Sequence, residues 1–224
     1  MMQRTLKALA ALLAYPQQPL IDTMPEISGE VGRSDSLSTA VRAGLTRLGT
    51  LLYGGDLIDA QERYVALFDR TRSLSLHLFE HVHGDSRERG PAMVDLLSVY
   101  SHHGLEIADN ELPDYLPLYL EYASTLDAEA ARAALDDVAQ ILRPIRDRLV
   151  KRHSPYAPVF DAILILAGAW VPAGEGAGDP EEDDPAALDQ AWEEAAVMFG
   201  PDAAPDRNQG CGRAETILAR MNVQ

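Results

Sequence analysis

Apolar residues recur along this chain at intervals of three and four, the spacing that puts side chains on one face of an α-helix. Near the N-terminus Leu6, Leu9, Leu12 and Leu13 follow this spacing, and the helix is expected to end before Pro16. No segment alternates apolar and polar residues between hairpin turns, as a half-buried strand would. The pattern therefore predicts an all-α protein that folds as a single-domain helical bundle.

The same spacing predicts several further helices. Their apolar stripes are Leu37, Val41, Leu45 and Leu48; Leu57, Tyr64 and Phe68; Met93, Leu96, Leu97 and Tyr100; Leu112, Tyr115, Leu116 and Tyr119; Leu135, Val138, Leu142, Ile145 and Leu149; and Tyr156, Val159, Phe160, Ile163 and Leu166. Asp35 or Ser36 is the expected N-cap of the first of these, and Gly54 is expected to end it. Pro144 should kink or end its helix near Arg143, and Ser154 should cap the last one.

Composition changes after Val171. The stretch 172–185 is rich in Gly, Pro, Asp and Glu, which predicts a loop or linker. A last helix is expected over 186–199. We therefore predict a helical domain over 1–171, an acidic linker over 172–185, and a C-terminal helix with a variable tail over 186–224.

The formal net charge is −16. Nucleic acid and anionic lipid are disfavoured as partners, because both attract Lys and Arg, whereas a partner with a basic segment is favoured. The lone Cys211 cannot form an internal disulfide, which fits a reducing compartment. The run Ala8–Tyr15 resembles a signal peptide only superficially, and 162–171 is too short to span a bilayer, so we expect a cytoplasmic protein.

One motif suggests catalysis. His77-Leu78-Phe79-Glu80-His81 matches H-x-x-E-H, a pattern of zinc peptidases. On a helix, His77 and His81 would lie one turn apart and could share a zinc ion, with Glu80 polarising a bound water. No later segment supplies an obvious third ligand, and no phosphate-binding loop or G-x-S-x-G motif is present. A zinc hydrolase is the minor alternative.

A longer segment carries a resemblance. Its parts are Tyr64-Val65-Ala66-Leu67-Phe68-Asp69-Arg70, then the run from Ser75 to Gly90, Ala92-Met93-Val94-Asp95-Leu96-Leu97, and Glu111-Leu112-Pro113-Asp114-Tyr115-Leu116-Pro117-Leu118. These residues, with Leu12-Leu13-Ala14-Tyr15-Pro16, are similar to the respiratory nitrate reductase assembly chaperones, also called delta subunits. The similarity covers roughly 6–149. These proteins are relatives of the redox-enzyme maturation chaperones.

The resemblance implies an all-helical, non-catalytic protein that holds no cofactor or metal. It implies binding to the N-terminal peptide of the nitrate reductase catalytic (alpha) subunit in the cytoplasm while the molybdenum cofactor is inserted. It allows contact with molybdenum cofactor delivery proteins, and it implies absence from the finished membrane enzyme. A chaperone of another molybdoenzyme, such as a dimethyl sulfoxide or trimethylamine oxide reductase, is the alternative within the same class.

Two sets of site residues follow from this reading. The predicted peptide groove, with its supporting core, consists of apolar and aromatic residues that suit an amphipathic helix: Tyr64, Leu67, Phe68, Phe79, Met93, Leu96, Tyr100, Tyr115 and Tyr119. The predicted polar rim consists of Glu80, His83, Asp85, Arg87, Asp95 and Asp114. Sequence alone does not separate residues that touch a peptide from residues that hold the helices in place.

Overall fold

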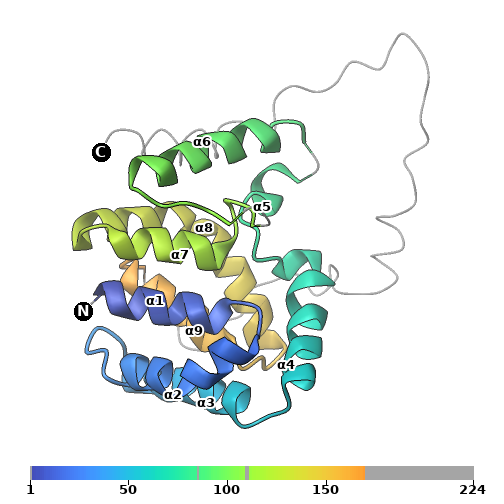
Figure 1. The fold of residues 1–224 in the computed structure, drawn as a ribbon, viewed down its shortest axis with the longest axis vertical. Coiled ribbons are helices and arrows are strands. Elements are labelled where there is room, and N and C mark those ends of the chain that lie inside the picture. Colours follow the sequence, from blue (N-terminus) through green and yellow to red (C-terminus); the bar gives the residue numbers. More distant parts are fainter. Residues whose placement is uncertain (1, 85, 109–110, 170–224) are drawn as a thin grey trace, which may run out of the picture.

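The structure is a computed structural model that describes residues 2–84, 86–108 and 111–169 (Figure 1). The described residues form an all-α fold, as predicted, with one isolated antiparallel bridge between His77 and Tyr115. The elements are α1 (Met2–Leu13), α2 (Gln18–Gly32), α3 (Thr39–Tyr53), α4 (Leu57–Tyr64), the π-helix η1 (Val65–Asp69), the 3₁₀-helix η2 (Arg72–Leu74), α5 (Glu80–His83), α6 (Arg89–His102), α7 (Leu116–Thr125), α8 (Ala128–Lys151) and α9 (Ala157–Leu166).

The first helix lies at the centre of the bundle. It packs against α2, α7 and α9, and Leu6, Leu9, Leu12 and Leu13 are fully buried in these contacts. The predicted helix and its end before Pro16 are thus confirmed. Burying these four leucines contributes on the order of 2 kcal/mol each, so α1 is a structural element of the core. No helix among the described residues is long and apolar enough to cross a bilayer.

The second helix was not anticipated from the sequence. It contains Pro25 and buries only Ile21, Met24 and Val31, a stripe too sparse for the periodicity to show. It packs mainly against α3. The N-cap of α3 is Ser38, whose hydroxyl accepts the Val41 N–H, so the expected cap at Asp35 or Ser36 was wrong.

The fourth helix continues without a break into the π-helix η1. Asp56 caps α4 by accepting the Ile58 N–H, and the Arg70 N–H bonds to the Val65 carbonyl five residues earlier. π-Helical turns insert one extra residue into a helix and are frequent at functional sites. Figure 1 shows α4 standing at the edge of the bundle, and Ile58, Asp59, Glu62 and Arg63 of this helix are exposed.

The two C-terminal helices of the described part differ from their predicted bounds. α8 runs through Pro144 to Lys151, so of the two outcomes predicted for Pro144, a kink or an end near Arg143, the end was wrong. The surrounding packing outweighs the hydrogen bond that proline cannot donate, since Leu142 and Ile145 are buried. α9 begins at Ala157, three residues after Ser154, whose hydroxyl instead accepts the Tyr156 N–H in the preceding turn.

Helix α6 lies at the end of the molecule opposite to α2 and α3, whereas α7 lies between α6 and α1 and packs against α1 (Figure 1). α7 begins at Leu116, and Leu112 is exposed ahead of it, so the predicted stripe overestimated the helix. α6 ends near Gly104, as predicted, and this glycine adopts a positive φ of 74°. Leu97, which was placed on the apolar stripe of α6, is exposed. The predicted linker 172–185 and the predicted helix 186–199 lie outside the described residues.

Candidate functional site

The first feature of the candidate site is a pair of tyrosine hydroxyl groups. The Tyr64 hydroxyl donates to the Leu13 carbonyl over 2.9 Å, and it lies 2.7 Å from the Tyr115 hydroxyl. Because the single proton of Tyr64 serves Leu13, Tyr115 is the donor between the two hydroxyls. Burial raises the pKa of both phenols above the ordinary value, so both stay protonated at neutral pH. The pair ties α1, α4 and the loop before α7 together.

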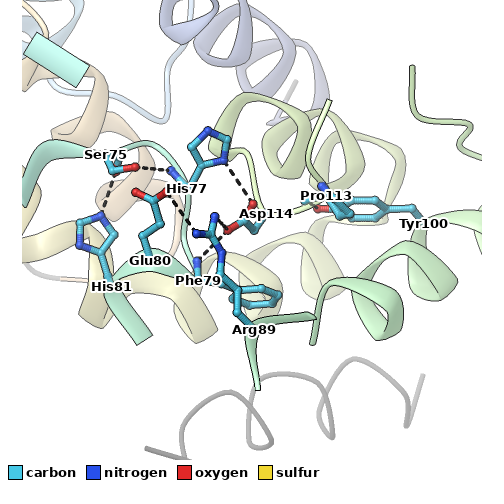
Figure 2. A network of polar contacts seen from close by, with 9 residues as sticks. All are labelled: Ser75, His77, Phe79, Glu80, His81, Arg89, Tyr100, Pro113 and Asp114. Carbon is cyan, nitrogen blue, oxygen red and sulfur yellow. Dashed lines mark hydrogen bonds and ion pairs between the residues drawn. The ribbon is translucent and has the colours of Figure 1, made fainter. Parts of the chain in front are cut away.

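The next layer is a network around Asp114, shown in Figure 2. This carboxylate is fully buried, and it accepts the Phe79 N–H over 3.1 Å. His77 Nδ1 lies 3.2 Å from its other oxygen. The Asp114 carbonyl also accepts the Leu78 N–H. A buried carboxylate is costly unless it is hydrogen-bonded, and here each oxygen has a partner.

Arg89 joins this network to α6. Its guanidinium lies 3.5 Å from Asp114 and 3.3 Å from Glu80 (Figure 2). On the far side of Asp114, the Tyr100 hydroxyl donates to the Pro113 carbonyl over 2.9 Å. Both ends of α6 are therefore attached to the loop before α7 by polar contacts.

The histidines of the H-x-x-E-H motif face different partners. His77 precedes α5 and does not share a helix with His81, so the helical geometry that a shared zinc ion would require was wrong. His81 Nε2 lies 2.9 Å from the Ser75 carbonyl, and burial lowers the pKa of this imidazole below its ordinary value. Neutral His81 therefore donates to Ser75. Among the described residues, no group of three His, Cys, Asp or Glu side chains is placed to hold a metal ion.

Two hollows with partly apolar linings lie along the segment formed by α4 and η1. We call the first the Tyr15 hollow; its volume is about 560 Å³, and it is lined by Tyr15, Ile58, Gln61, Glu62, Val65, Ala66 and Arg70. Ile58 is 63% exposed and Tyr15 is 38% exposed, so both offer apolar surface to solvent. The charged residues of the lining are one acid, Glu62, and one base, Arg70. This hollow is thus partly apolar and carries charges of both signs at its edge.

The second, which we call the Tyr156 hollow, has a volume of about 400 Å³. It is lined by Leu51, Leu52, Arg63, Ala66, Leu67, Arg152, His153, Ser154, Pro155 and Tyr156. Ala66 lines both hollows, so the small side chain of one π-helical residue lies between them.

A third hollow is polar. It has a volume of about 360 Å³ and is lined by Phe68, Asp69, Arg72, Ser75, His77, Glu80 and Arg89. Its lining therefore includes three residues of the network around Asp114, namely His77, Glu80 and Arg89. Charges of both signs meet here, which suits polar contacts with a peptide more than capture of a single ion.

The predicted groove residues lie mostly in the core. Six of the nine are buried: Tyr64, Phe68, Phe79, Leu96, Tyr100 and Tyr119. The others are partly exposed: Leu67 at the Tyr156 hollow, Met93 on α6, and Tyr115 beside Tyr64. The six buried residues therefore belong to the core that supports the groove, which the sequence analysis included in the prediction. Contact with a peptide stays a prediction for all nine residues.

The predicted rim residues are spread over several environments. Glu80 is half-buried in the Arg89 ion pair, whereas Arg87 and Asp95 are exposed and Asp114 lies inside the protein. His83 stacks edge-on against Phe79 at 5.6 Å. Its Nε2 atom is buried and has no hydrogen-bond partner within the described part of the chain. Asp85 lies outside the described residues.

Sequence reasoning missed several residues that the structure brings to the site. Arg89 was not selected, although it contacts both Glu80 and Asp114. Ile58 and Tyr15 were not selected either, because the residue type alone does not show whether an apolar side chain is exposed or buried. The only available signal was that Ile58 follows the N-cap Asp56 closely, where the first turn of a helix is often exposed.

Comparison with known proteins identifies the family. The profile described as "Nitrate reductase delta subunit" matches residues 34–162, more than half of the chain. The chain belongs to the nitrate reductase delta subunit family. The match includes α3 to α8 and therefore the tyrosine pair, the Asp114 network and the lining residues of the hollows except Tyr15.

Curated members of the delta subunit family resemble this chain over most of its length. The nitrate reductase molybdenum cofactor assembly chaperone NarJ of Escherichia coli (strain K12) is 42% identical over 212 residues, which are 91% of this chain and 86% of the relative. The probable assembly chaperone NarW of the same strain is 40% identical over 203 residues, 89% and 85% of the two chains. The probable NarJ of Bacillus subtilis (strain 168) is 30% identical over 165 residues, 72% and 87%. The chain described in this structure is therefore an assembly chaperone by family and not an enzyme.

Proposed function

We propose that this protein binds the N-terminal peptide of the nitrate reductase catalytic subunit in the cytoplasm. It keeps that subunit competent for molybdenum cofactor insertion and complex assembly before membrane attachment. Membership of the delta subunit family supports the class of client, since the relatives carry the name of nitrate reductase molybdenum cofactor assembly chaperones. The observation that carries the binding mode is the Tyr15 hollow.

The Tyr15 hollow has the properties that an amphipathic peptide helix needs. Ile58 and Tyr15 offer exposed apolar surface, and burying an isoleucine side chain contributes roughly 1.5–3 kcal/mol. A hollow of about 560 Å³ takes a few anchoring side chains and not a whole helix, so the rest of the peptide would lie along α4. Peptide helices dock in this manner, with anchors at i, i+3, i+4 and i+7.

Charge supports the same site. Glu62 lines the hollow and Asp59 is exposed one turn before it on α4, so two acids stand against Arg70, the one base of the lining, and the whole chain carries a net charge of −16. A basic peptide would be steered to this side and would gain affinity from it. The apolar anchors would supply most of the binding energy, since exposed ion pairs contribute about 1 kcal/mol or less.

The test is a calorimetric titration of the full chain with a synthetic peptide that covers the first 20 or so residues of the catalytic subunit. Ile58→Ser should weaken binding about tenfold, which corresponds to roughly 1.4 kcal/mol of lost apolar contact. The matched control is Val94→Ser on α6, because Val94 is 66% exposed, close to the 63% of Ile58. Equal affinities for the two variants would exclude the Tyr15 hollow.

Two further arms separate the alternatives. Affinity should fall between low and moderate salt, because screening weakens the attraction of a basic peptide to these carboxylates. The corresponding peptide from another molybdoenzyme serves as the competitor. If it binds more tightly than the nitrate reductase peptide, the client is that enzyme, and if neither peptide binds at high micromolar concentration, peptide chaperoning is refuted.

A further inference from the structure

The Tyr156 hollow has a charge opposite to that of the whole molecule. Arg63, Arg152 and His153 are exposed at its edge, beside the apolar side chains of Leu67 and Tyr156. No carboxylate is among the described residues that line it. In a chain with a net charge of −16, a cationic edge around an apolar hollow is a local exception, and it favours an acidic and apolar occupant.

The backbone at this edge is held in an uncommon conformation. His153 has a φ of 51°, in the left-handed region that side chains other than glycine rarely adopt. The turn is fixed by the His153 N–H bonding to the Val150 carbonyl and by the Ser154 N–H bonding to the Leu149 carbonyl. Strained residues of this kind persist where the surroundings fix them, and they are frequent at binding sites.

We propose that the Tyr156 hollow binds the acidic segment 179–199 of this same chain. This segment holds eight carboxylates (Asp179, Glu181, Glu182, Asp183, Asp184, Asp189, Glu193 and Glu194) and no basic residue. On a helix, Leu188, Trp192 and Phe199 share one face, since they are separated by four and seven residues. The segment thus combines an apolar stripe with the charge that Arg63 and Arg152 attract.

The covalent connection permits this contact. Tyr156 precedes α9 directly, and the ten residues Ala157–Leu166 of that helix span roughly 15 Å. The 18 residues between Ala169 and Leu188 can extend over about 60 Å, so the segment can return to the hollow with length to spare. Attachment in the same chain also keeps the local concentration of the segment high, in the millimolar range for short flexible links.

Other occupants fit less well. The end of the chain, 207–224, carries three arginines and one glutamate, so the edge of the hollow would repel it. A basic client peptide would be repelled for the same reason, and it is assigned above to the Tyr15 hollow. The inference does not depend on the client, and its test uses no client peptide.

The experiment follows the environment of Trp192 in the full chain. Trp170→Phe leaves Trp192 as the only tryptophan, and its exposure is measured by acrylamide quenching, since acrylamide is uncharged. Arg63→Glu combined with Arg152→Glu should raise the quenching constant at least twofold. The control double variant is Arg4→Glu with Arg47→Glu, because both residues are exposed and the change in net charge is the same.

A rescue and a salt arm complete the design. Asp189→Arg and Glu193→Arg are added to the Arg63→Glu, Arg152→Glu variant. The four substitutions together should restore at least half of the lost protection of Trp192 from acrylamide. In the parent, 0.5 M NaCl should itself raise the quenching constant, which tests the inference even if the reversed variant fails to fold.

Three results would overturn the inference. Trp192 could be quenched in the parent as freely as a free tryptophan amide, or it could respond equally to both double variants. Protection that disappears on dilution would assign the hollow to the segment of a second copy and not to that of the same chain.

Discussion

Asp114→Asn tests whether the buried network holds α6 in place. The substitution preserves the shape of the side chain and removes its charge. The Phe79 N–H and Arg89 both bind Oδ2 of Asp114, and His77 Nδ1 binds Oδ1. The asparagine oxygen can take the place of Oδ2, so both contacts remain but lose the charge of their acceptor, and the amide group faces His77. His77, which is 32% exposed at its side chain, can turn to water and should matter less.

The expected cost is about 1–2 kcal/mol of unfolding free energy. A hydrogen bond to a charged group contributes roughly 1.5–3 kcal/mol and a neutral one roughly 0.5–1.5 kcal/mol, so the buried Phe79 N–H loses the difference of about 1 kcal/mol. The ion pair with Arg89 adds less, because it is 3.5 Å long and the guanidinium is 25% exposed. A carboxylate with 0% exposure leaves little room for water to replace the lost contacts.

The assay is urea unfolding followed by circular dichroism. With an m-value of about 2 kcal/mol per molar, the midpoint should fall by about 0.5–1 M. Asp95→Asn on the exposed side of α6 is the control, and it should change stability by less than about 0.5 kcal/mol. Arg89→Gln should cost less in the Asp114→Asn background than in the parent, since the two residues interact. A loss below about 1 kcal/mol, or strict additivity, would refute the role assigned to this network.

Three other substitutions have defined outcomes. Tyr64→Phe removes the donor to the Leu13 carbonyl and the acceptor of the Tyr115 hydroxyl, and it should cost about 2 kcal/mol in the same urea assay, with a loss under 0.5 kcal/mol contradicting the hydroxyl pair. His81→Gln should flatten the decline of stability below pH 6.5, because the lowered pKa makes the unfolded state take up the proton first; thermal melts at pH 7.5 and 5.5 that show the same decline in both proteins would exclude this. Pro144→Ala should raise the melting temperature by several degrees, since it restores a helical N–H donor, and an unchanged or lower value in calorimetry would show that the proline is accommodated without cost.

The repeated apolar spacing was sufficient to predict the all-α fold and the place of most helices. It was sufficient because a three-to-four spacing is set by the geometry of one helix. Where the outcome depended on packing elsewhere, it was insufficient: Pro144 stays helical because both neighbouring turns are buried, and Pro25 lies inside a helix with a sparse stripe. The cap at Ser38 could not be distinguished from Asp35 or Ser36, since all three have suitable side chains.

The candidate site was less accessible to prediction than the fold. Asp114 was selected as a rim residue, but its partners Phe79 and His77 are more than thirty residues away in sequence, and only tertiary structure shows that they enclose it. Aromatic residues were selected for a groove because tyrosine suits both cores and interfaces, and exposure decides between the two. Ile58 and Tyr15 became visible as candidates only through their exposure.

The position of Ala66 has a consequence for any pair of ligands. Its methyl group is part of the lining of both the Tyr15 hollow and the Tyr156 hollow, on a π-helical turn that joins their walls. A ligand that shifts this turn on one side changes the free energy of binding on the other. By thermodynamic reciprocity the effect is equal in both directions. A ligand bound in either hollow would therefore change the affinity of the other hollow for its own ligand by the same factor.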